Sequence, residues 1–218
     1  MVRLPPPIVG VTLGVAGSKG VDGLLRQVEV AVTAGLEGLL LREPALEDGV
    51  LFALALECRR LMGSGWLAIS DRLHVALRCE ADAVQLGFRS LGATEVRGLE
   101  VSSRGTAPGR RLAVGVSDHA LPRREDLRSA DFATLAPWAE VPGKGAPLGA
   151  DGFRACLEDR ARAGMASPTW ALGGLGPHDL SSVRDAGAHG AFLLRGMDWA
   201  GRPDLAVEKL LGAWEGSA

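Results

Sequence analysis

Two glycine-containing turns near the C-terminus have residue types suited to holding an anion. The first is Leu172-Gly173-Gly174-Leu175, and the second is the run that ends at Arg195-Gly196. Glycine N–H groups are not shielded by a Cβ atom, and a helix that begins beside them adds its dipole. As the last two strand ends of a strand–helix chain, the turns indicate a phosphate site. The same glycines could instead serve only as tight turns.

Further polar side chains occur where apolar runs end. They are Arg42 and Glu43, Ser70 and Asp71, Gln85 with Arg89, Ser117 with Asp118 and His119, and Lys144. If the runs are parallel strands of one barrel, these side chains lie on the rim where barrel enzymes place their chemistry. A structural interpretation stays open for Arg42, Glu43 and Asp71, which could form salt bridges or helix caps.

His119 is the best candidate for proton transfer. Its unperturbed pKa of about 6.5 allows it to accept and return a proton near neutrality. His74, His178 and His189 fall on or beside predicted helices, and we interpret them as surface or packing residues. His119 could also do no more than bond a neighbouring carbonyl, and Asp118 beside it would raise its pKa if the side chains meet.

The elements that must position these residues alternate regularly. Predicted strands span residues 8–13, 38–43, 66–70, 83–87, 112–117, 132–135, 170–172 and 192–194, and predicted helices span 21–33, 51–61, 71–77, 95–99, 123–128, 153–162, 178–185 and 205–214. The strands are apolar on both faces, which is typical of a covered parallel sheet. Eight such units predict an α/β fold in which residues 1–218 form a single (β/α)8 TIM barrel.

Two irregular stretches are candidate active-site loops. Residues 101–110 precede a strand and would lie on the stability face of a barrel, whereas residues 137–149 follow the sixth strand and would lie on the catalytic face. The second loop, which contains Lys144, is therefore the better functional candidate. The first strand is not followed by a G-x-G-x-x-G motif, and this weakens a dinucleotide-binding alternative.

Composition excludes several classes of partner. The 218 residues carry a net charge of −2, with 5% aromatic residues and no tyrosine, so neither nucleic acid nor an anionic membrane is expected as a partner. Cys58, Cys79 and Cys156 show no metal-ligand spacing and do not form a disulfide framework. The N-terminus has no long apolar segment, so we expect no signal peptide or membrane span and a cytoplasmic protein.

The chain resembles the thiamine phosphate synthase/TenI family over about residues 39–196. The segments that carry the resemblance are LLLRE (39–43), ISDRLHVAL (69–77), ADAVQLGFRSL (81–91), VGVSDH (114–119), ALGGL (171–175) and HGAFLLRG (189–196). The resemblance implies a (β/α)8 barrel that binds a thiazole ethyl phosphate, with its phosphate on the turns after strands seven and eight. Homo-oligomers are common among barrels of this family.

Departures from the family pattern separate its two activities. The synthase joins a pyrimidine pyrophosphate to the thiazole phosphate with Mg²⁺ held by two aspartates. The synthase pattern has glutamine where this chain has Leu40, lysine where it has Pro44, asparagine where it has Ser70, and its second aspartate near Ser90. Of that group of residues, this chain keeps only Asp71. One carboxylate without a pyrophosphate clamp would hold Mg²⁺ poorly. The sequence thus predicts no metal or cofactor, and Mg²⁺ only if the synthase activity holds.

The segment VQLGFRSL instead is similar to the TenI-type thiazole tautomerase, in which a histidine matching His119 moves the proton. The resemblance implies isomerisation of the non-aromatic carboxythiazole phosphate tautomer to its aromatic form. Arg42, Gln85 or Lys144 are candidates to orient the substrate carboxylate, and Ser117 lies beside them in the predicted site. Arg195 replaces a small residue in the phosphate turn, where it would either clamp or obstruct the phosphate.

Two alternatives to the tautomerase remain from the sequence. One is a diverged thiamine phosphate synthase, and the other is a catalytically silent paralogue that binds a phosphorylated ligand for regulation or pathway assembly.

Overall fold

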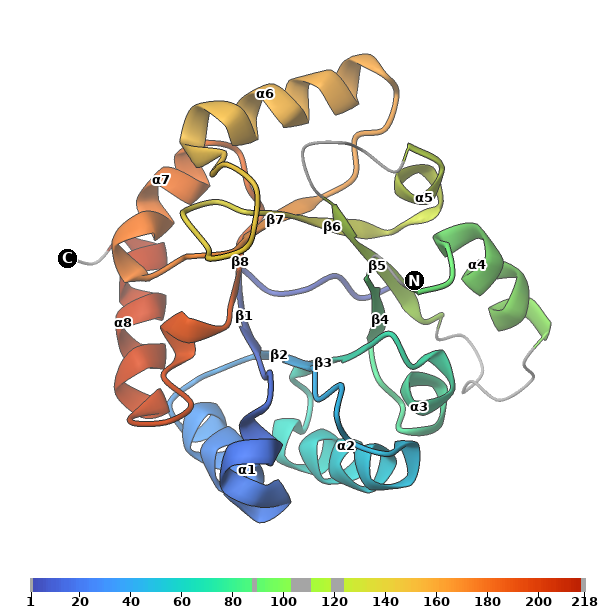
Figure 1. Ribbon diagram of the computed structural model, residues 1–218, viewed down its shortest axis with the longest axis vertical. Coiled ribbons are helices and arrows are strands. Elements are labelled where there is room, and N and C mark those ends of the chain that lie inside the picture. The colour runs from blue at the N-terminus through green and yellow to red at the C-terminus, as the bar shows by residue number, and fades with distance from the viewer. Residues whose placement is uncertain (1, 88–89, 103–110, 119–123, 217–218) are drawn as a thin grey trace.

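The computed structural model describes residues 2–87, 90–102, 111–118 and 124–216. Its eight strands are β1 (Ile8–Val11), β2 (Gly38–Leu41), β3 (Trp66–Ser70), β4 (Ala83–Leu86), β5 (Ala113–Asp118), β6 (Phe132–Leu135), β7 (Thr169–Leu172) and β8 (Ala191–Leu193). They pair in sequence order, all in parallel, and β8 pairs with β1 to close the barrel (Figure 1). The predicted single (β/α)8 barrel is confirmed.

Helices follow the strands and surround the barrel in Figure 1. They are α1 (Val15–Thr33), α2 (Asp48–Met62), α3 (Leu73–Arg78), α4 (Ala93–Ser102), α5 (Arg124–Ser129), α6 (Gly149–Arg162), α7 (Leu180–Asp185) and α8 (Pro203–Glu215), with short 3₁₀ turns η1 (Pro177–Asp179) and η2 (Arg195–Met197). Within the described residues, every helix is too short or too polar to span a bilayer.

The predicted elements match the observed ones except near their ends. The largest difference is at α1, which begins six residues before the predicted start at residue 21. Gly20 adopts φ 73° and ψ 166° inside it, so a short first turn and the main helix meet there at a break. Glycine reaches that conformation without a Cβ clash. The helical spacing of apolar residues predicts only the main helix, because the break at Gly20 separates the first turn from that spacing.

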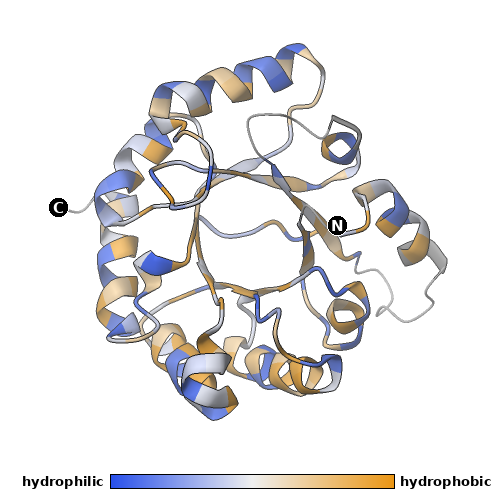
Figure 2. Cartoon of the chain, viewed as in Figure 1, coloured by the Kyte–Doolittle hydropathy of each residue, from blue (hydrophilic) through white to orange (hydrophobic). Residues whose placement is uncertain are grey.

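Alternation along the strands divides the apolar side chains between two cores. One core lies inside the barrel, where Trp66, Phe132, Trp170 and Phe192 meet with ring centroids 5.8–6.3 Å apart. All four come from the first or second residue of their strands, so they fill the N-terminal half of the barrel. The other core lies between the strands and the helices, which combine hydrophobic and hydrophilic residues (Figure 2).

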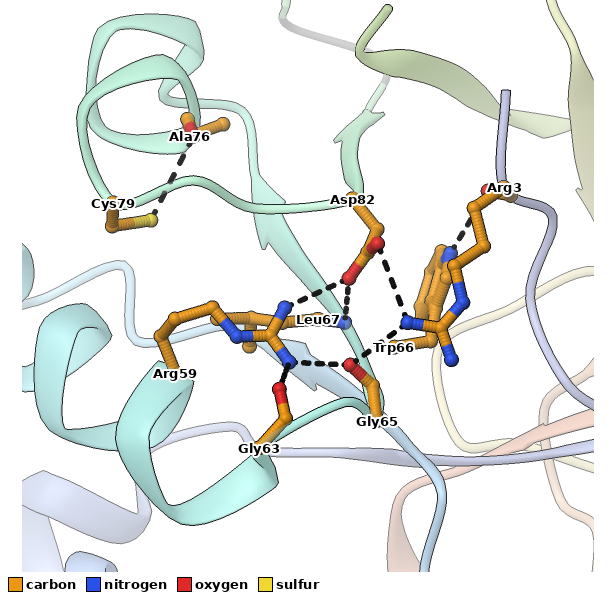
Figure 3. A network of polar contacts seen from close by, with 9 residues as sticks. All are labelled: Arg3, Arg59, Gly63, Gly65, Trp66, Leu67, Ala76, Cys79 and Asp82. Atoms are coloured by element: carbon orange, nitrogen blue, oxygen red, sulfur yellow. Dashed lines mark hydrogen bonds and ion pairs between the residues drawn. The ribbon is translucent and has the colours of Figure 1, made fainter. Parts of the chain in front are cut away.

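The N-terminal face is held by a polar network around Asp82, the residue before β4 (Figure 3). Its carboxylate accepts hydrogen bonds from the Arg59 guanidinium (2.8 Å) and from the Leu67 N–H (2.9 Å). Arg3 lies 3.6 Å from the other carboxylate oxygen. The backbone carbonyl of Arg3 accepts a hydrogen bond from the Trp66 indole (3.2 Å), so the N-terminal segment is held against the N-terminal end of the barrel. Such features at this face serve stability.

Candidate functional site

The turn after β7 exposes backbone donors at the C-terminal rim of the barrel. Gly173 and Gly174 have φ values of 96° and 77°, which favour glycine. Among the described residues, neither N–H has a hydrogen-bond acceptor. The Gly173 carbonyl accepts the Ala139 N–H (3.0 Å), and a Cβ at Gly174 would lie 2.9 Å from the Cβ of Ala139. Both the predicted turn role and a free pair of amides are therefore present.

The turn after β8 lies against the turn after β7. A Cβ at Gly196 would lie 3.0 Å from the Leu175 carbonyl oxygen, so the two backbones approach closely. Arg195 and Gly196 open the 3₁₀ turn η2, and their N–H groups also have no acceptor within the described part of the chain. The Arg195 side chain is exposed. Four unpaired N–H groups on two adjacent turns form a surface suited to an anion.

A polar cluster occupies the barrel interior near the same rim. The Gln85 amide nitrogen of β4 donates to the Ser117 hydroxyl (3.0 Å) and to the Thr134 hydroxyl (3.3 Å), on β5 and β6. Gln85 is only 3% exposed, and its carbonyl oxygen has no partner among the described residues. Gly115 makes room for it, because a Cβ there would overlap both this oxygen and the Phe132 ring. A buried, unpaired acceptor is costly unless a ligand or water satisfies it.

Arg42 follows β2 at the same rim and is half-buried. Its backbone N–H donates to the buried Thr12 hydroxyl (2.9 Å), which fixes the main chain. Within the described residues, its guanidinium forms no hydrogen bond or ion pair. A partly desolvated guanidinium of this kind is suited to binding a carboxylate through two parallel hydrogen bonds.

Asp71 lies within the electrostatic influence of Arg42, and three donors hold its carboxylate. Its carboxylate accepts bonds from the Ser70 hydroxyl (2.8 Å), the Gly87 N–H (2.9 Å) and the Ser90 hydroxyl. Burial alone would raise the pKa of the Asp71 carboxyl, but these hydrogen bonds and the charge of Arg42 outweigh it and hold the pKa below its usual value. The position has φ 65°, which aspartate tolerates better than most residues.

The structural interpretation of Glu43 is confirmed, whereas that of Asp71 as a helix cap is wrong. The Glu43 carboxylate is buried and accepts the N–H groups of Val15 and Ala16 (both 3.2 Å), so it caps α1. Helix α3 begins at Leu73 after Arg72, and the Asp71 side chain bonds to the β3 and β4 ends instead of to that helix.

The residues present do not fit the Mg²⁺ site that the family resemblance implies for the synthase. Asp71 is the single carboxylate of the set, and its oxygens are already engaged by Ser70, Ser90 and Gly87. Within the described residues there is no group of three or more His, Cys, Asp or Glu side chains able to hold a metal. Serine hydroxyls would not replace a second carboxylate for a hard dication.

One predicted site residue, Lys144, makes no side-chain hydrogen bond or ion pair with the others among the described residues, and another, His119, is not described. Lys144 is exposed in the β6–α6 loop, where its N–H donates to the Val141 carbonyl (3.0 Å). His119 lies outside the described residues, and β5 ends at the residue before it.

The other three histidines are surface residues, as predicted. His74 pairs with Asp48 (2.9 Å), His178 is exposed on η1, and His189 accepts the Thr169 N–H at the opposite end of the barrel (3.3 Å).

Sequence reasoning missed Thr12 and Thr134. Both are buried polar residues, one directly after β1 and the other inside the otherwise apolar β6. The signal for Thr134 was available, because it alternates with Ala133 and Leu135 and therefore faces the barrel interior, as Gln85 and Ser117 do. The signal for Thr12 was weaker, since its bond to Arg42 depends on how β1 and β2 pair.

These features define a class: a (β/α)8 barrel with backbone N–H groups that lack a described acceptor at the ends of β7 and β8, and with a polar cluster inside the barrel at β4–β6. Residues 13–197 match the TMP-TENI family, described as thiamine monophosphate synthase. A relative from Geobacter sulfurreducens is 33% identical over 78% of this chain and 78% of its own length. The chain belongs to this family.

Other relatives and solved structures agree. The thiamine-phosphate synthase of Moorella thermoacetica is 28% identical, covering 85% of this chain and 86% of its own. That of a Nostoc species is 27% identical over 87% of this chain, which spans only 52% of the relative. A thiamine phosphate pyrophosphorylase from Pyrococcus furiosus superposes with a TM-score of 0.75 at 19% identity, covering 97% and 96% of the two chains, which supports the fold.

Proposed function

We propose that this protein is a thiazole tautomerase of the TenI type. It would convert the non-aromatic carboxythiazole ethyl phosphate tautomer into the aromatic carboxythiazole ethyl phosphate. The observation that carries the proposal is that the unpaired N–H groups after β7 and β8 lie on the same rim as the end of β5, the strand that His119 follows. A phosphate bound by the main chain would leave the heterocycle near the polar cluster of Gln85, Ser117 and Thr134.

Binding divides among three groups of this chain. The N–H groups of Gly173, Gly174 and Gly196 hold the phosphate, with the exposed Arg195 side chain near them as an added cation. Arg42 takes the substrate carboxylate, since its guanidinium is half-buried and without a described partner. Gln85 then presents an amide fixed by Ser117 and Thr134 to the ring.

The reaction is a proton shift in which atoms and electrons balance within the substrate. His119 removes a proton from a ring carbon, the electron pair moves into the ring, and the protonated imidazole returns a proton to the exocyclic carbon. Aromatisation drives the step, so one imidazole suffices as both base and acid. General acid–base catalysis of this kind contributes about 10²–10⁴-fold. No metal or cofactor is required.

The test is to mix the purified protein with the tautomer and follow thiazole absorbance. The wild type should accelerate aromatisation, and His119→Asn should remove about 10²–10⁴-fold of that acceleration while inorganic phosphate still binds. A wild-type rate equal to the uncatalysed rate would contradict the proposal. Retained phosphate binding in that case would favour a silent phosphate-ligand-binding paralogue.

Thiamine phosphate synthase is the second candidate, because the curated relatives named above carry that name. The engaged Asp71 carboxylate and the apolar Leu40 and Pro44 argue against it. Formation of thiamine phosphate from both substrates with Mg²⁺ at a substantial rate would make the synthase the better assignment.

A further inference from the structure

A buried ion pair joins the end of β5 to α6, behind the proposed site. The Arg160 guanidinium donates to an Asp118 carboxylate oxygen at 2.5 Å, and the two side chains are 5% and 3% exposed. Arg160 also donates to the Thr169 hydroxyl at the start of β7 (3.1 Å). Since Ser117 faces the barrel interior, Asp118 faces outward, between the strands and the helices, where α6 lies outside β6 and β7 (Figure 1).

Stability alone does not account for this pair. Both side chains are buried, and moving two charges out of water cancels much or all of their attraction. Well-packed apolar side chains of similar volume commonly replace such pairs at no cost in stability. A forked guanidinium that binds two fixed partners does fix their relative positions.

The position of Asp118 indicates what the fixed geometry of the ion pair could serve. It is the last residue of β5, and its backbone carbonyl accepts the Ala136 N–H (3.1 Å) at the start of the β6–α6 loop. Arg160 thereby ties α6 and β7 to the point from which the β5–α5 and β6–α6 loops both leave the barrel. The first of these loops begins with His119, and the second carries Lys144.

We propose that Asp118 and Arg160 are positioning residues that fix the end of β5, from which the chain continues directly to His119, the base of the proposed reaction. The inference rests on the proposed tautomerase function. Arg160 acts through Asp118 from outside the barrel and touches no substrate. Its loss should therefore slow the proton shift and leave binding of the phosphate ester intact.

The experiment measures kcat, KM and the dissociation constant for inorganic phosphate in four variants. Arg160→Met should lower kcat about 10²-fold, the cost of a misplaced catalytic group, with KM and phosphate affinity close to the wild type. Arg160→Lys keeps the charge but loses the fork, so it should recover part of kcat. Asp118→Leu combined with Arg160→Met removes both charges, so the fold should survive while kcat stays low.

Arg59→Met is the matched control, because Arg59 pairs with Asp82 at the opposite face of the barrel (2.8 Å). It should lower the unfolding temperature without lowering kcat. Wild-type kcat in the folded double variant, or an equal kcat loss in Arg59→Met, would overturn the positioning role alone. An inactive wild type would overturn the proposed function and this inference together.

Discussion

At the scale of single residues, the site is defined by polar groups whose partners are fixed or missing. Asp71 accepts from three donors, whereas within the described residues the Gln85 carbonyl oxygen has no donor and the Arg42 guanidinium has no acceptor. Groups already satisfied hold the architecture, and unsatisfied groups are available to a ligand. On this basis Asp71 is structural in this chain, and Gln85 and Arg42 are candidates for substrate contact.

Asp71 should contribute stability that depends on pH in one direction. Because the folded state lowers the pKa of its carboxyl, the contribution is complete above the unfolded value of about 3.9 and is lost as pH falls through the folded pKa. Asp71→Asn tolerates the positive φ but accepts these bonds more weakly, and should cost about 1 kcal/mol or less at pH 7 after solvent screening.

Urea unfolding of the wild type and Asp71→Asn at pH 7 and at pH 3 measures this effect. The difference in unfolding free energy should shrink in acid, and a difference that grows on acidification would show that the Asp71 hydrogen bonds do not favour its charged form.

At the scale of elements, the turn after β7 joins two neighbouring loops. The Trp138 N–H donates to the Leu172 carbonyl (2.9 Å), and Gly174 has no room for a Cβ beside Ala139. The predicted catalytic-face loop is thus packed on the predicted phosphate turn. Sequence alone predicted both segments but could not show that they touch, because the contact spans more than 30 residues of chain.

Gly174→Ala should destabilise the fold and weaken phosphate binding, and Gly143→Ala is its matched control. Both positions have nearly equal φ, 77° and 76°, so each loses about 1–2 kcal/mol from the left-handed backbone. Around Gly143 a Cβ would have open space, whereas at Gly174 it would meet Ala139 and cost about 1–3 kcal/mol more. Calorimetric titration with inorganic phosphate should show reduced affinity in Gly174→Ala alone, and equal affinities would count against this turn as the phosphate site.

At the scale of the whole molecule, the two ends of the barrel have different tasks. The N-terminal end carries the aromatic interior and acidic residues that precede strands. Asp82 binds the Leu67 N–H, and Asp131 binds the Val114 N–H (2.8 Å), each with arginine partners. The same carboxylate-to-backbone hydrogen bond thus occurs before β4 and before β6, and each time it joins the start of a strand to the strand that precedes it in the chain.

Asp82→Ala should therefore reduce stability and leave catalysis intact. It removes the carboxylate that accepts from the Leu67 N–H and from the Arg59 guanidinium, and breaking a buried pair in this way costs about 3–5 kcal/mol. Glu57 lies on α2, as Arg59 does, and serves as the control. Glu57→Ala breaks only the exposed pair with Arg60 and should cost about 0–1 kcal/mol. Denaturant unfolding and the tautomer assay would separate the two effects, and a large loss of kcat in folded Asp82→Ala would refute this division of tasks.

The sequence by itself determined the barrel and the rim. Apolar runs on both faces, alternating with amphipathic stretches, specify a covered parallel sheet, and the period-two alternation already marks which side chains enter the barrel. The glycines after β7 and β8 were recognisable because glycine permits left-handed backbone and close backbone approaches that other residues do not. Only the tertiary structure decided the partners of Asp71, Gln85 and Asp118, which are 19, 32 and 42 residues away in Ser90, Ser117 and Arg160. Local chain preferences act over a few residues, whereas these contacts depend on strand register and helix placement, which closure of the whole barrel sets.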